Sequence, residues 1–289
     1  ENGYPEKVFV QRGFFHAVFE FKNNYRLHVL GAHLKSRLFH PRYNQTDMRR
    51  YEARLLRYLV NDIQDQEKDA NIIVVGDFND IYSADPLSTI RAPEKTPDRR
   101  LYDLRPVDYA GMPWTHWWHS EDAYGRIDFA LVSAALVPEI DFRRTEIVHL
   151  PDYWMFASDH RPVMATIRTE DAPLWDNASL EKYFPDTVRN TYEDIGQSRN
   201  TGKEKKNGTV EVEGRKVSVC FMDAGGFSSE APAARKDALA GELRKSDADI
   251  IALSGVGDAA SAEELVKSLP GYVLSGKVVG QDRETMIVV

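Results

Sequence analysis

The chain has 289 residues, of which 42% are hydrophobic and 28% are charged, a composition typical of a globular protein rather than a disordered one. No apolar run approaches the roughly 20 residues that span a bilayer, so we expect no stable membrane insertion. The net charge of −8 argues against a protein that coats nucleic acid through its overall field, and the single cysteine, Cys220, excludes a disulfide framework and a thiolate zinc cluster.

The start of the chain does not identify a cellular compartment. Residues 1–7 are polar, and no secretory signal follows them. Because the first residue is Glu1 rather than methionine, we expect an incomplete N-terminus, and secreted, periplasmic and cytoplasmic locations all stay open. The sequence gives no sign of an obligate protein partner.

The first 171 residues alternate between predicted strands and a predicted helix. Residues 8–20 alternate apolar and polar side chains, with Gly13 as a bend, and residues 25–32 form a second strand. Apolar runs typical of strands buried on both faces follow at residues 71–75, 127–132 and 163–167. This order predicts a layered α/β or α+β sandwich.

Residues 47–63 have helical spacing, with Thr46 as the expected N-cap. The apolar side of this helix carries Tyr51, Leu55, Leu56, Tyr58 and Leu59, and the other side carries Arg49, Arg50, Glu52 and Arg57. Together with Arg54, the arginines either line a groove for a polyanion or form a solvated helix face. The second interpretation is favoured.

The composition changes near Asp171. Residues 172–210 are polar and predict a linker with short helices near residues 180–184 and 187–195. A new unit follows over residues 211–289. Its predicted strands lie at 216–222, 249–256, 272–278 and 285–289, and its predicted helices at 233–245 and 262–269. Because the last strand is interrupted by the end of the sequence, we expect a truncated chain.

Four polar clusters lie directly beside predicted strands. Because strand ends present side chains to a shared crevice, we expect these clusters to converge. Their carboxylates, amide and imidazoles suit a hard divalent cation such as Mg²⁺, or Mn²⁺, which neutralises charge on a phosphate. A Ser/His/Asp hydrolase fits less well, because no serine lies in a nucleophile elbow. The clusters are residues 31–36 (GAHLKS), 76–80 (GDFND), 126–128 (RID) and 158–162 (SDHRP).

Each cluster taken alone also has a simpler structural interpretation. An Asp–Asn pair after a strand is commonly a turn or a helix cap. Asp128 beside Arg126 is compatible with a surface ion pair, and His33 with a hydrogen-bonded histidine at a strand end. The occurrence of all four clusters in this order favours a shared chemical role.

In this order, the segments GAHLKS, GDFND, RIDFALVS and SDHRPV resemble the later motifs of the endonuclease/exonuclease/phosphatase superfamily. That superfamily includes deoxyribonuclease I, abasic-site endonucleases, bacterial sphingomyelinases and inositol-polyphosphate phosphatases. The resemblance covers about residues 8–168. It implies a two-sheet α/β sandwich of the deoxyribonuclease I type, flanked by helices, with one divalent-metal site.

The resemblance implies catalytic roles for five residues. Asp77 would position or deprotonate the attacking water, and Asn79 would hold a phosphate oxygen. Asp128 would orient His160 against the scissile phosphate, and His33 would be a second histidine that faces the phosphate.

Further residues would bind the metal or the substrate. Asp159 would lie at the metal or directly behind its ligands. Lys35 and Arg161 would contact phosphate, with surface charge as the alternative, and Trp114 would form a substrate wall, with core packing as the alternative. The histidines of the segment WTHWWHS (residues 114–120) do not favour zinc, because carboxylate ligands at metal spacing are missing.

The superfamily normally begins with a strand that ends in Trp–Asn or Tyr–Asn, followed by a strand that ends in Gln–Glu, whose Glu binds the metal. Residues 217–227 and 249–258 resemble these two strands. The chain is therefore interpreted as the catalytic C-terminal half of the domain over residues 1–171, a linker over 172–210, and a degenerate front half over 211–289. Tandem copies, which we favour, and a circular permutation both explain this order, and in either case the two units should dock.

In the front half, the expected Asn falls on Asp223, which becomes the second expected metal residue, and the expected Glu falls on Gly255. Gly255 offers no carboxylate, and Asp258 would replace it only if the backbone bends. The leading hypothesis is a divalent-metal-dependent phosphoester hydrolase, and the alternative is a pseudoenzyme or binding module. The substrate is a nucleic acid, a phospholipid head group or a small phosphoester, selected by loops such as residues 91–105 and 112–124.

Overall fold

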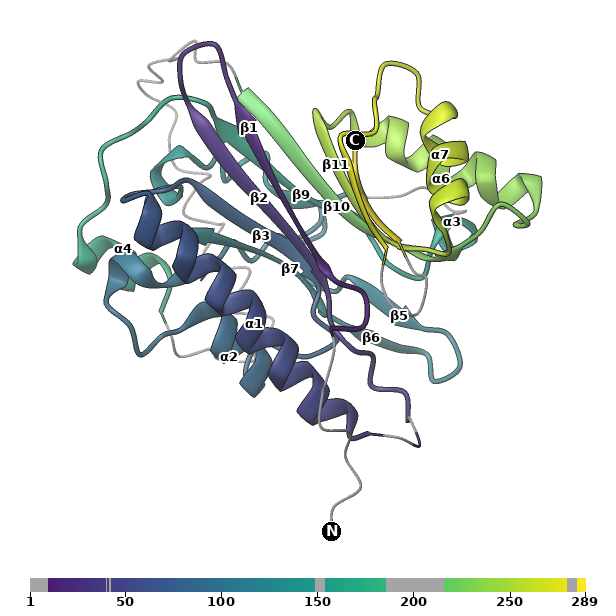
Figure 1. Ribbon diagram of the computed structural model, residues 1–289, viewed down its shortest axis with the longest axis horizontal. Helices are drawn as coiled ribbons and strands as arrows, with labels where there is room; N and C mark the ends of the chain where they lie inside the picture. Colours follow the sequence, from purple (N-terminus) through teal and green to yellow (C-terminus); the bar gives the residue numbers. More distant parts are fainter. Residues whose placement is uncertain (1–9, 40, 42, 149–153, 186–215, 280–284) are drawn as a thin grey trace.

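Two β-sheets pack face to face in the computed structural model, and helices cover their outer sides (Figure 1). The structure describes residues 10–39, 41, 43–148, 154–185, 216–279 and 285–289. The predicted two-sheet α/β sandwich is thereby confirmed. Among the described residues, none of the helices combines the length and the apolar character that crossing a bilayer requires.

The first sheet is built from residues that precede position 134. Its central pair, β2 and β3, is parallel, and the outer pairs are antiparallel. Both central strands are buried along almost their whole length, as their apolar sequences predict. The strand order is β1 (Phe14–Glu20), β2 (Arg26–His33), β3 (Ile72–Asp77), β7 (Asp128–Ser133) and β4 (Leu101–Asp103).

The second sheet combines strands from both sides of the predicted linker. Strand β10 pairs antiparallel with β9, from Lys216 opposite Arg168 to Phe221 opposite Val163. The strand that follows the predicted linker therefore extends the sheet to which β9 belongs. The strand order is β12 (Gly276–Val279), β13 (Thr285–Val288), β11 (Ile250–Val256), β10 (Lys216–Phe227), β9 (Val163–Arg168) and β8 (Glu146–Ile147).

A short hairpin and the helices complete the described elements. The hairpin is formed by β5 (His116–Trp118) and β6 (Ala123–Gly125). The helices are α1 (Gln45–Gln66), α2 (Asp85–Arg91), α3 (Trp154–Ala157), α4 (Asn177–Tyr183), α6 (Ala233–Ser246) and α7 (Ala259–Lys267), with 3₁₀ turns at Pro97–Arg99 and Val137–Glu139.

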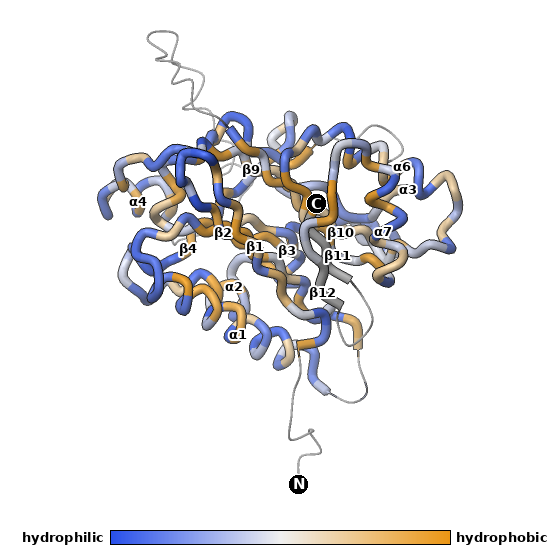
Figure 2. Tube along the Cα trace, turned by 45° about the horizontal axis from the view of Figure 1, so that its top comes forward, coloured by the Kyte–Doolittle hydropathy of each residue, from blue (hydrophilic) through white to orange (hydrophobic). Residues whose placement is uncertain are grey.

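Three apolar clusters separate these layers. The central cluster lies between the sheets and includes Val75 and Val132 from the first sheet and Val219 and Phe221 from the second. A second cluster packs α1 and α2 against the first sheet, and a third packs α6 and α7 against the second. In Figure 2, hydrophobic residues accordingly follow the strands, and hydrophilic residues gather at the periphery.

Helix α1 differs from its prediction in its cap and in its faces. Asn44, not Thr46, caps the helix, because its side-chain oxygen accepts hydrogen bonds from the backbone N–H groups of Thr46 and Asp47. The predicted apolar side is partly exposed, at Tyr51, Leu55 and Tyr58, whereas three charged residues of the predicted polar side are buried, namely Arg49, Glu52 and Arg57.

The bounds of other elements also differ from those predicted from the sequence. Strand β1 begins only at Phe14, because Gly13 has a φ of 76°, which breaks the extended backbone. The strand predicted over residues 272–278 is β12, which begins at Gly276. Part of the predicted linker folds against the sandwich, since Leu180 and Phe184 join the central cluster. The helix predicted over 187–195 lies outside the described residues.

We expect Phe221→Ala to destabilise the whole sandwich. Phe221 is fully buried between the sheets, so truncation leaves a cavity and should lower the free energy of unfolding by about 3–5 kcal/mol. Urea denaturation measures the loss. Tyr51→Ala on the exposed face of α1 is the control and should change the free energy by no more than about 0.5 kcal/mol. Equal effects of the two variants would contradict the described packing.

Candidate active site

The register of the first sheet places three ionisable residues in one row. His33 on β2 lies opposite Asp77 on β3, and Asp77 lies opposite Asp128 on β7. Each residue stands at the end of a buried strand, and each is less than a tenth exposed. The clusters that contain them, predicted to converge, therefore meet at one edge of this sheet.

The second sheet contributes Asp223 and Ser254, which are paired across β10 and β11. The Ser254 hydroxyl donates to Asp223 Oδ2 at 2.5 Å, and the backbone N–H of Gly225 donates to Asp223 Oδ1 at 2.7 Å. His33 lies between the sheets, with Nε2 3.3 Å from Asp77 Oδ2 and Nδ1 3.1 Å from Asp223 Oδ2. One imidazole thus connects a carboxylate from each sheet.

His160 enters the row from the loop before β9. Its Nδ1 lies 3.0 Å from Asp128 Oδ2. The Ser158 hydroxyl fixes this loop, because it accepts from the backbone N–H of His160 at 3.0 Å and donates to the carbonyl of Asp223 at 2.6 Å. The Thr115 hydroxyl in turn accepts from the backbone N–H of Asp128 at 3.1 Å. The histidine and its carboxylate are therefore each held by a buried hydroxyl.

Asn79 contacts Asp77 twice. Its backbone N–H donates to Asp77 Oδ1 at 2.7 Å, and its side-chain amide donates to Asp77 Oδ2 at 2.9 Å and to the carbonyl of Leu34 at 3.0 Å. The residue has a φ of 50°, a left-handed conformation that asparagine tolerates. Both amide hydrogens are engaged, so Asn79 orients Asp77, and the phosphate contact expected of Asn79 stays a prediction.

Burial and neighbouring charges set the protonation of the centre. Burial raises the pKa of Asp77 to about 6, with His33 opposing this shift and Asp128 adding to it. Burial lowers the pKa of His160, but the carboxylate of Asp128 outweighs it and holds that pKa well above its ordinary value. Burial also raises the pKa of Asp223, but the neighbouring His33 outweighs this effect and keeps that pKa well below its usual range. Two carboxylates are thus paired with imidazoles.

The donor set fits a divalent cation. Asp77, Asp128 and Asp223 bring three carboxylates into one buried centre, together with the imidazoles of His33 and His160. Three groups of side chains have ligand atoms within 4.8 Å of one another. They are His33, Asp77 and Asp223; Asp77, Asp128 and His160; and His116, Asp159 and His160.

The two expected metal residues lie in different groups. Asp223 belongs with Asp77 and His33, whereas Asp159, whose side chain is 54% exposed, lies 3.4 Å from His116 Nε2. Asp258 is the N-cap of α7, where its side chain accepts from the backbone N–H and the hydroxyl of Ser261. Asp258 therefore does not replace the missing glutamate.

Gly255 has no room for a side chain. Its φ is 67°, and a Cβ atom built on it would lie 2.4 Å from Asp223 Oδ1. The carboxylate of Asp223 therefore lies where a side chain at position 255 would begin. A glutamate at this position would have to displace both its own backbone and Asp223.

The three residues expected to bind the substrate, Arg161, Trp114 and Lys35, lie in three different surroundings. Arg161 is buried, with its guanidinium 2.8 Å from Asp108 Oδ2 and its CZ atom 4.0 Å from the centroid of the Trp114 ring. These contacts connect Arg161 to the base of the hairpin, and the phosphate contact expected of Arg161 stays a prediction. Trp114 is half-buried and also packs edge-on against Tyr124. Lys35 is buried, and its Nζ donates to the Ser36 hydroxyl at 2.7 Å.

Sequence reasoning expected residues 112–124 to select the substrate, but it gave no role to His116, which adjoins the centre from the hairpin. His116 forms a β-bridge with His160, and its ring lies 4.5 Å from the His160 ring. The Trp117 backbone N–H also donates to the carbonyl of Asp159 at 3.1 Å. His116 therefore packs against the loop that carries His160. The WTHWWHS segment marked the region, but three-residue strands leave no periodic signal.

Comparison with known proteins identifies one matching family. Residues 9–160 match the Endonuclease/Exonuclease/phosphatase family, and they include His33, Asp77, Asp128 and His160. No curated protein sequence matches the chain.

Several solved structures resemble parts of the chain at low identity. An endonuclease/exonuclease/phosphatase from Bacteroides vulgatus is 20% identical, with 54% of this chain and 55% of that one covered and a TM-score of 0.37. A beta toxin from Staphylococcus aureus is 17% identical, with 53% and 56% covered and a TM-score of 0.38. A mannosyl-6-phosphatase from Bacteroides thetaiotaomicron is 16% identical, with 52% and 54% covered and a TM-score of 0.34. The chain spans about half the length of these structures.

We expect Gly255→Ala to destabilise the protein more than an ordinary positive-φ glycine does. The left-handed backbone alone costs about 1–2 kcal/mol for a residue with a Cβ, and the contact with Asp223 adds to this. Chemical denaturation should show a loss of more than about 2 kcal/mol. Gly111→Ala is the matched control, because Gly111 has a φ of 82° and open space around it. Equal losses in both variants would contradict the close approach of Asp223.

Proposed function

We propose that this chain, which belongs to the endonuclease/exonuclease/phosphatase family, hydrolyses a phosphoester at the edge where its two sheets meet. The observation that carries the proposal is the continuous chain of contacts from Asp223 through His33 to Asp77, beside the Asp128–His160 pair. Acids, bases and cation ligands for phosphoryl transfer are thus gathered in one buried centre.

Within this proposal, each side chain has a defined task. Asp77, held by both nitrogens of Asn79, orients the attacking water and accepts its proton. Asp128 holds Nδ1 of His160, which leaves Nε2 to donate a hydrogen bond to a phosphate oxygen. Asp128 and Asn79 act as positioning residues, and Asp77 and His160 contact the reacting groups.

We further propose that Asp223 binds a divalent cation, Mg²⁺ or Mn²⁺, beside Asp77, since ligand atoms of Asp223, Asp77 and His33 lie within 4.8 Å of one another. When bound, the cation supplies charge neutralisation at the phosphate. Asp159, which is exposed beside His116, stays a proposed metal residue, at the cation or behind its ligands.

The proposed substrate is a phosphoester, and the phosphate is the group that this centre recognises. A nucleic acid, a phospholipid head group and a small phosphoester all carry it. The hairpin β5–β6 stands beside His160 with the aromatic residues Trp117, Trp118 and Tyr124, so we propose that it selects among these substrates.

The second candidate is a binding module of the same fold without catalysis. The observation that favours it is Gly255, which removes the expected metal-binding glutamate and whose position is closed by Asp223. In this case the chain would bind a phosphoester without hydrolysing it. Turnover of an activated phosphodiester such as bis(p-nitrophenyl) phosphate, with Mg²⁺ or Mn²⁺, separates the two candidates.

We expect His160→Ala and Asp77→Asn each to lower kcat for bis(p-nitrophenyl) phosphate by about 10²-fold or more, because each removes a group that contacts the reacting atoms. Initial rates with Mn²⁺ measure the effect. His119→Ala is the control, since His119 is exposed on the same hairpin and should leave kcat unchanged. Near-normal rates in both centre variants would contradict the proposed roles.

We expect Asp223→Asn to weaken Mn²⁺ binding by about 10-fold or more, because it removes a carboxylate from the cation site. Electron paramagnetic resonance of free Mn²⁺ measures binding without reference to activity. Asp258→Asn is the control and should bind Mn²⁺ normally, since Asp258 caps α7. If Asp258→Asn lost Mn²⁺ binding and Asp223→Asn did not, the proposed cation site at Asp223 would be contradicted.

A further inference from the structure

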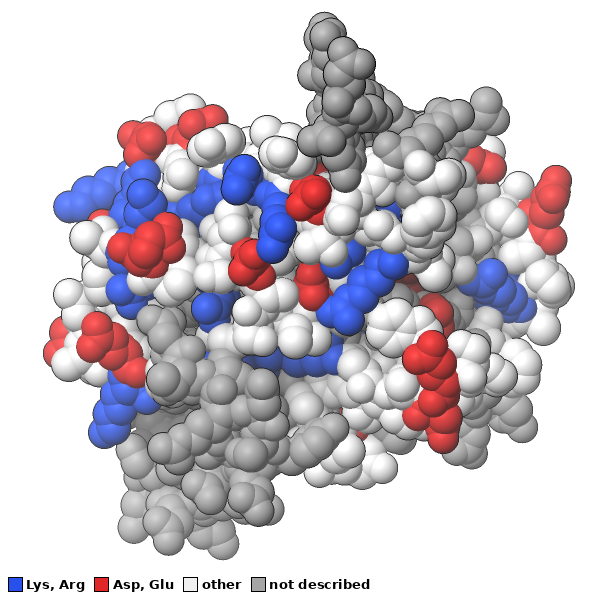
Figure 3. Space-filling view, turned by 90° about the horizontal axis from the view of Figure 1, so that it is seen from below, with Lys and Arg blue, Asp and Glu red and all other residues white. Residues whose placement is uncertain are grey.

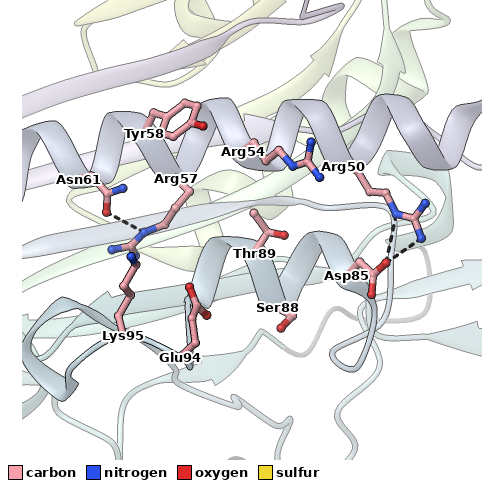
Figure 4. A pocket seen from close by; sticks show the side chains of 10 residues that line it. All are labelled: Arg50, Arg54, Arg57, Tyr58, Asn61, Asp85, Ser88, Thr89, Glu94 and Lys95. Carbon is pink, nitrogen blue, oxygen red and sulfur yellow. Dashed lines mark hydrogen bonds and ion pairs between the residues drawn. The ribbon is translucent and has the colours of Figure 1, made fainter.

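A second polar cavity lies between α1 and α2, on the outer side of the first sheet. It has a volume of about 520 Å³ and shares none of its lining residues with the candidate active site. Figure 4 shows Arg50 and Asp85 at one end, Arg57 and Lys95 at the other, and Arg54 between them. We call it the α1–α2 groove. It is lined by Arg50, Arg54, Arg57, Tyr58, Asn61, Asp85, Ser88, Thr89, Glu94 and Lys95.

The groove carries an excess of positive charge in a chain whose net charge is −8. Four cations and two carboxylates line it, and one of the cations, Arg50, is paired with Asp85 at 2.7 Å. Seen from below Figure 1, lysine and arginine side chains gather across the middle of the surface, with acidic side chains between them (Figure 3). The remaining three cations face one carboxylate, Glu94.

Arg54 and Lys95 are exposed cations without a carboxylate partner among the described contacts. Arg54 lies over the ring of Tyr51, with 5.6 Å from its CZ atom to the ring centroid. The described ion pairs include neither Arg54 nor the Lys95 ammonium group. Both side chains can therefore turn toward a ligand without breaking an ion pair.

Arg57 is a buried cation whose hydrogen bonds all go to neutral groups. It is 5% exposed, and its guanidinium donates to the side-chain oxygens of Asn61 and Gln64 and to the carbonyls of Ile90 and Arg99. Burial and the positive charge of Arg99 together lower the pKa of Arg57 to about 10, and the carboxylate of Glu94 opposes this shift. A desolvated guanidinium without a carboxylate at hydrogen-bond distance is an unbalanced charge at the base of a cavity.

We propose that the α1–α2 groove binds the phosphate dianion of a small phosphomonoester or of inorganic phosphate. The two excess positive charges match a dianion, and the ligand would supply the counter-charge that Arg57 lacks. The groove also offers the half-buried hydroxyls of Ser88 and Thr89 from α2, opposite the arginines of α1. A tetrahedral oxyanion can accept from both helices at once, whereas a planar carboxylate has only two oxygens to share.

This site is separate from the proposed hydrolysis. The groove is formed by the two helices and the turn after α2, and none of its lining residues belongs to the candidate active site. Its occupancy would tie α2 to α1 and would raise the stability of the whole chain by mass action.

Isothermal titration of the full chain with methyl phosphate at about pH 8, where the ester is a dianion, tests the proposal. We expect saturable binding that the double variant Arg54→Ala/Lys95→Ala weakens by about 10-fold or more. Both residues are exposed, so the variant should fold, which circular dichroism checks. The double variant Arg244→Ala/Lys245→Ala on α6 makes the same change in net charge and should bind methyl phosphate like the wild type.

Hydrogen–deuterium exchange then locates the ligand. We expect methyl phosphate to protect peptides of residues 45–66 and 85–95, because the groove lies between these segments. Protection confined to the strand ends around Asp77 and His160, equal affinities in the two double variants, or no saturable binding would each overturn the proposal. Vesicles that contain phosphatidic acid present the same group on a surface, and binding to them without binding to free methyl phosphate would also overturn it.

Discussion

The structure depends on the burial of opposite charges where the two sheets meet. His33 contacts Asp77 on its own sheet and Asp223 on the other, and both carboxylates are almost completely removed from water. A buried carboxylate without a partner is strongly destabilising, so the contacts of His33 favour the packing of the two sheets in which the imidazole lies between both carboxylates. The same contacts gather the groups to which we assign the proposed phosphoester hydrolysis.

The sequence predicted the strands and the strand-end residues because both leave local signals. Apolar runs identify β3, β7 and β9, and the polar clusters beside them contain Asp77, Asp128 and His160. The contact between His33 and Asp223 has no local signal, since it joins segments from opposite ends of the chain. The pairing of β10 with β9 sets the position of Asp223, so this contact can be identified only from the folded structure.

Helix α1 shows where periodicity misleads. The apolar residues predicted which side of the helix is buried, and Glu52 lies on the opposite side. Glu52 is nevertheless buried, because its carboxylate accepts hydrogen bonds from the backbone N–H groups of Lys35 and Gln11. Arg49 is buried because it pairs with Asp80 and with the carbonyl of Lys35. These partners are loop groups, whose positions depend on the tertiary fold. The polar face of α1 therefore holds the loop after β2 in place, and the apolar Tyr51 and Tyr58 are left outside.

The relation between Asp223 and Gly255 bears on both candidate functions. The family pattern has a neutral amide on the first strand and a carboxylate on the second, whereas this chain has a carboxylate on β10 and a glycine on β11. The two changes depend on each other, because a Cβ at position 255 would overlap the carboxylate of Asp223. This pair of strands therefore still contributes one carboxylate to the centre, but from β10 instead of β11. The missing glutamate is thus an argument against catalysis only if Asp223 fails to bind the cation, because the number of carboxylates is unchanged.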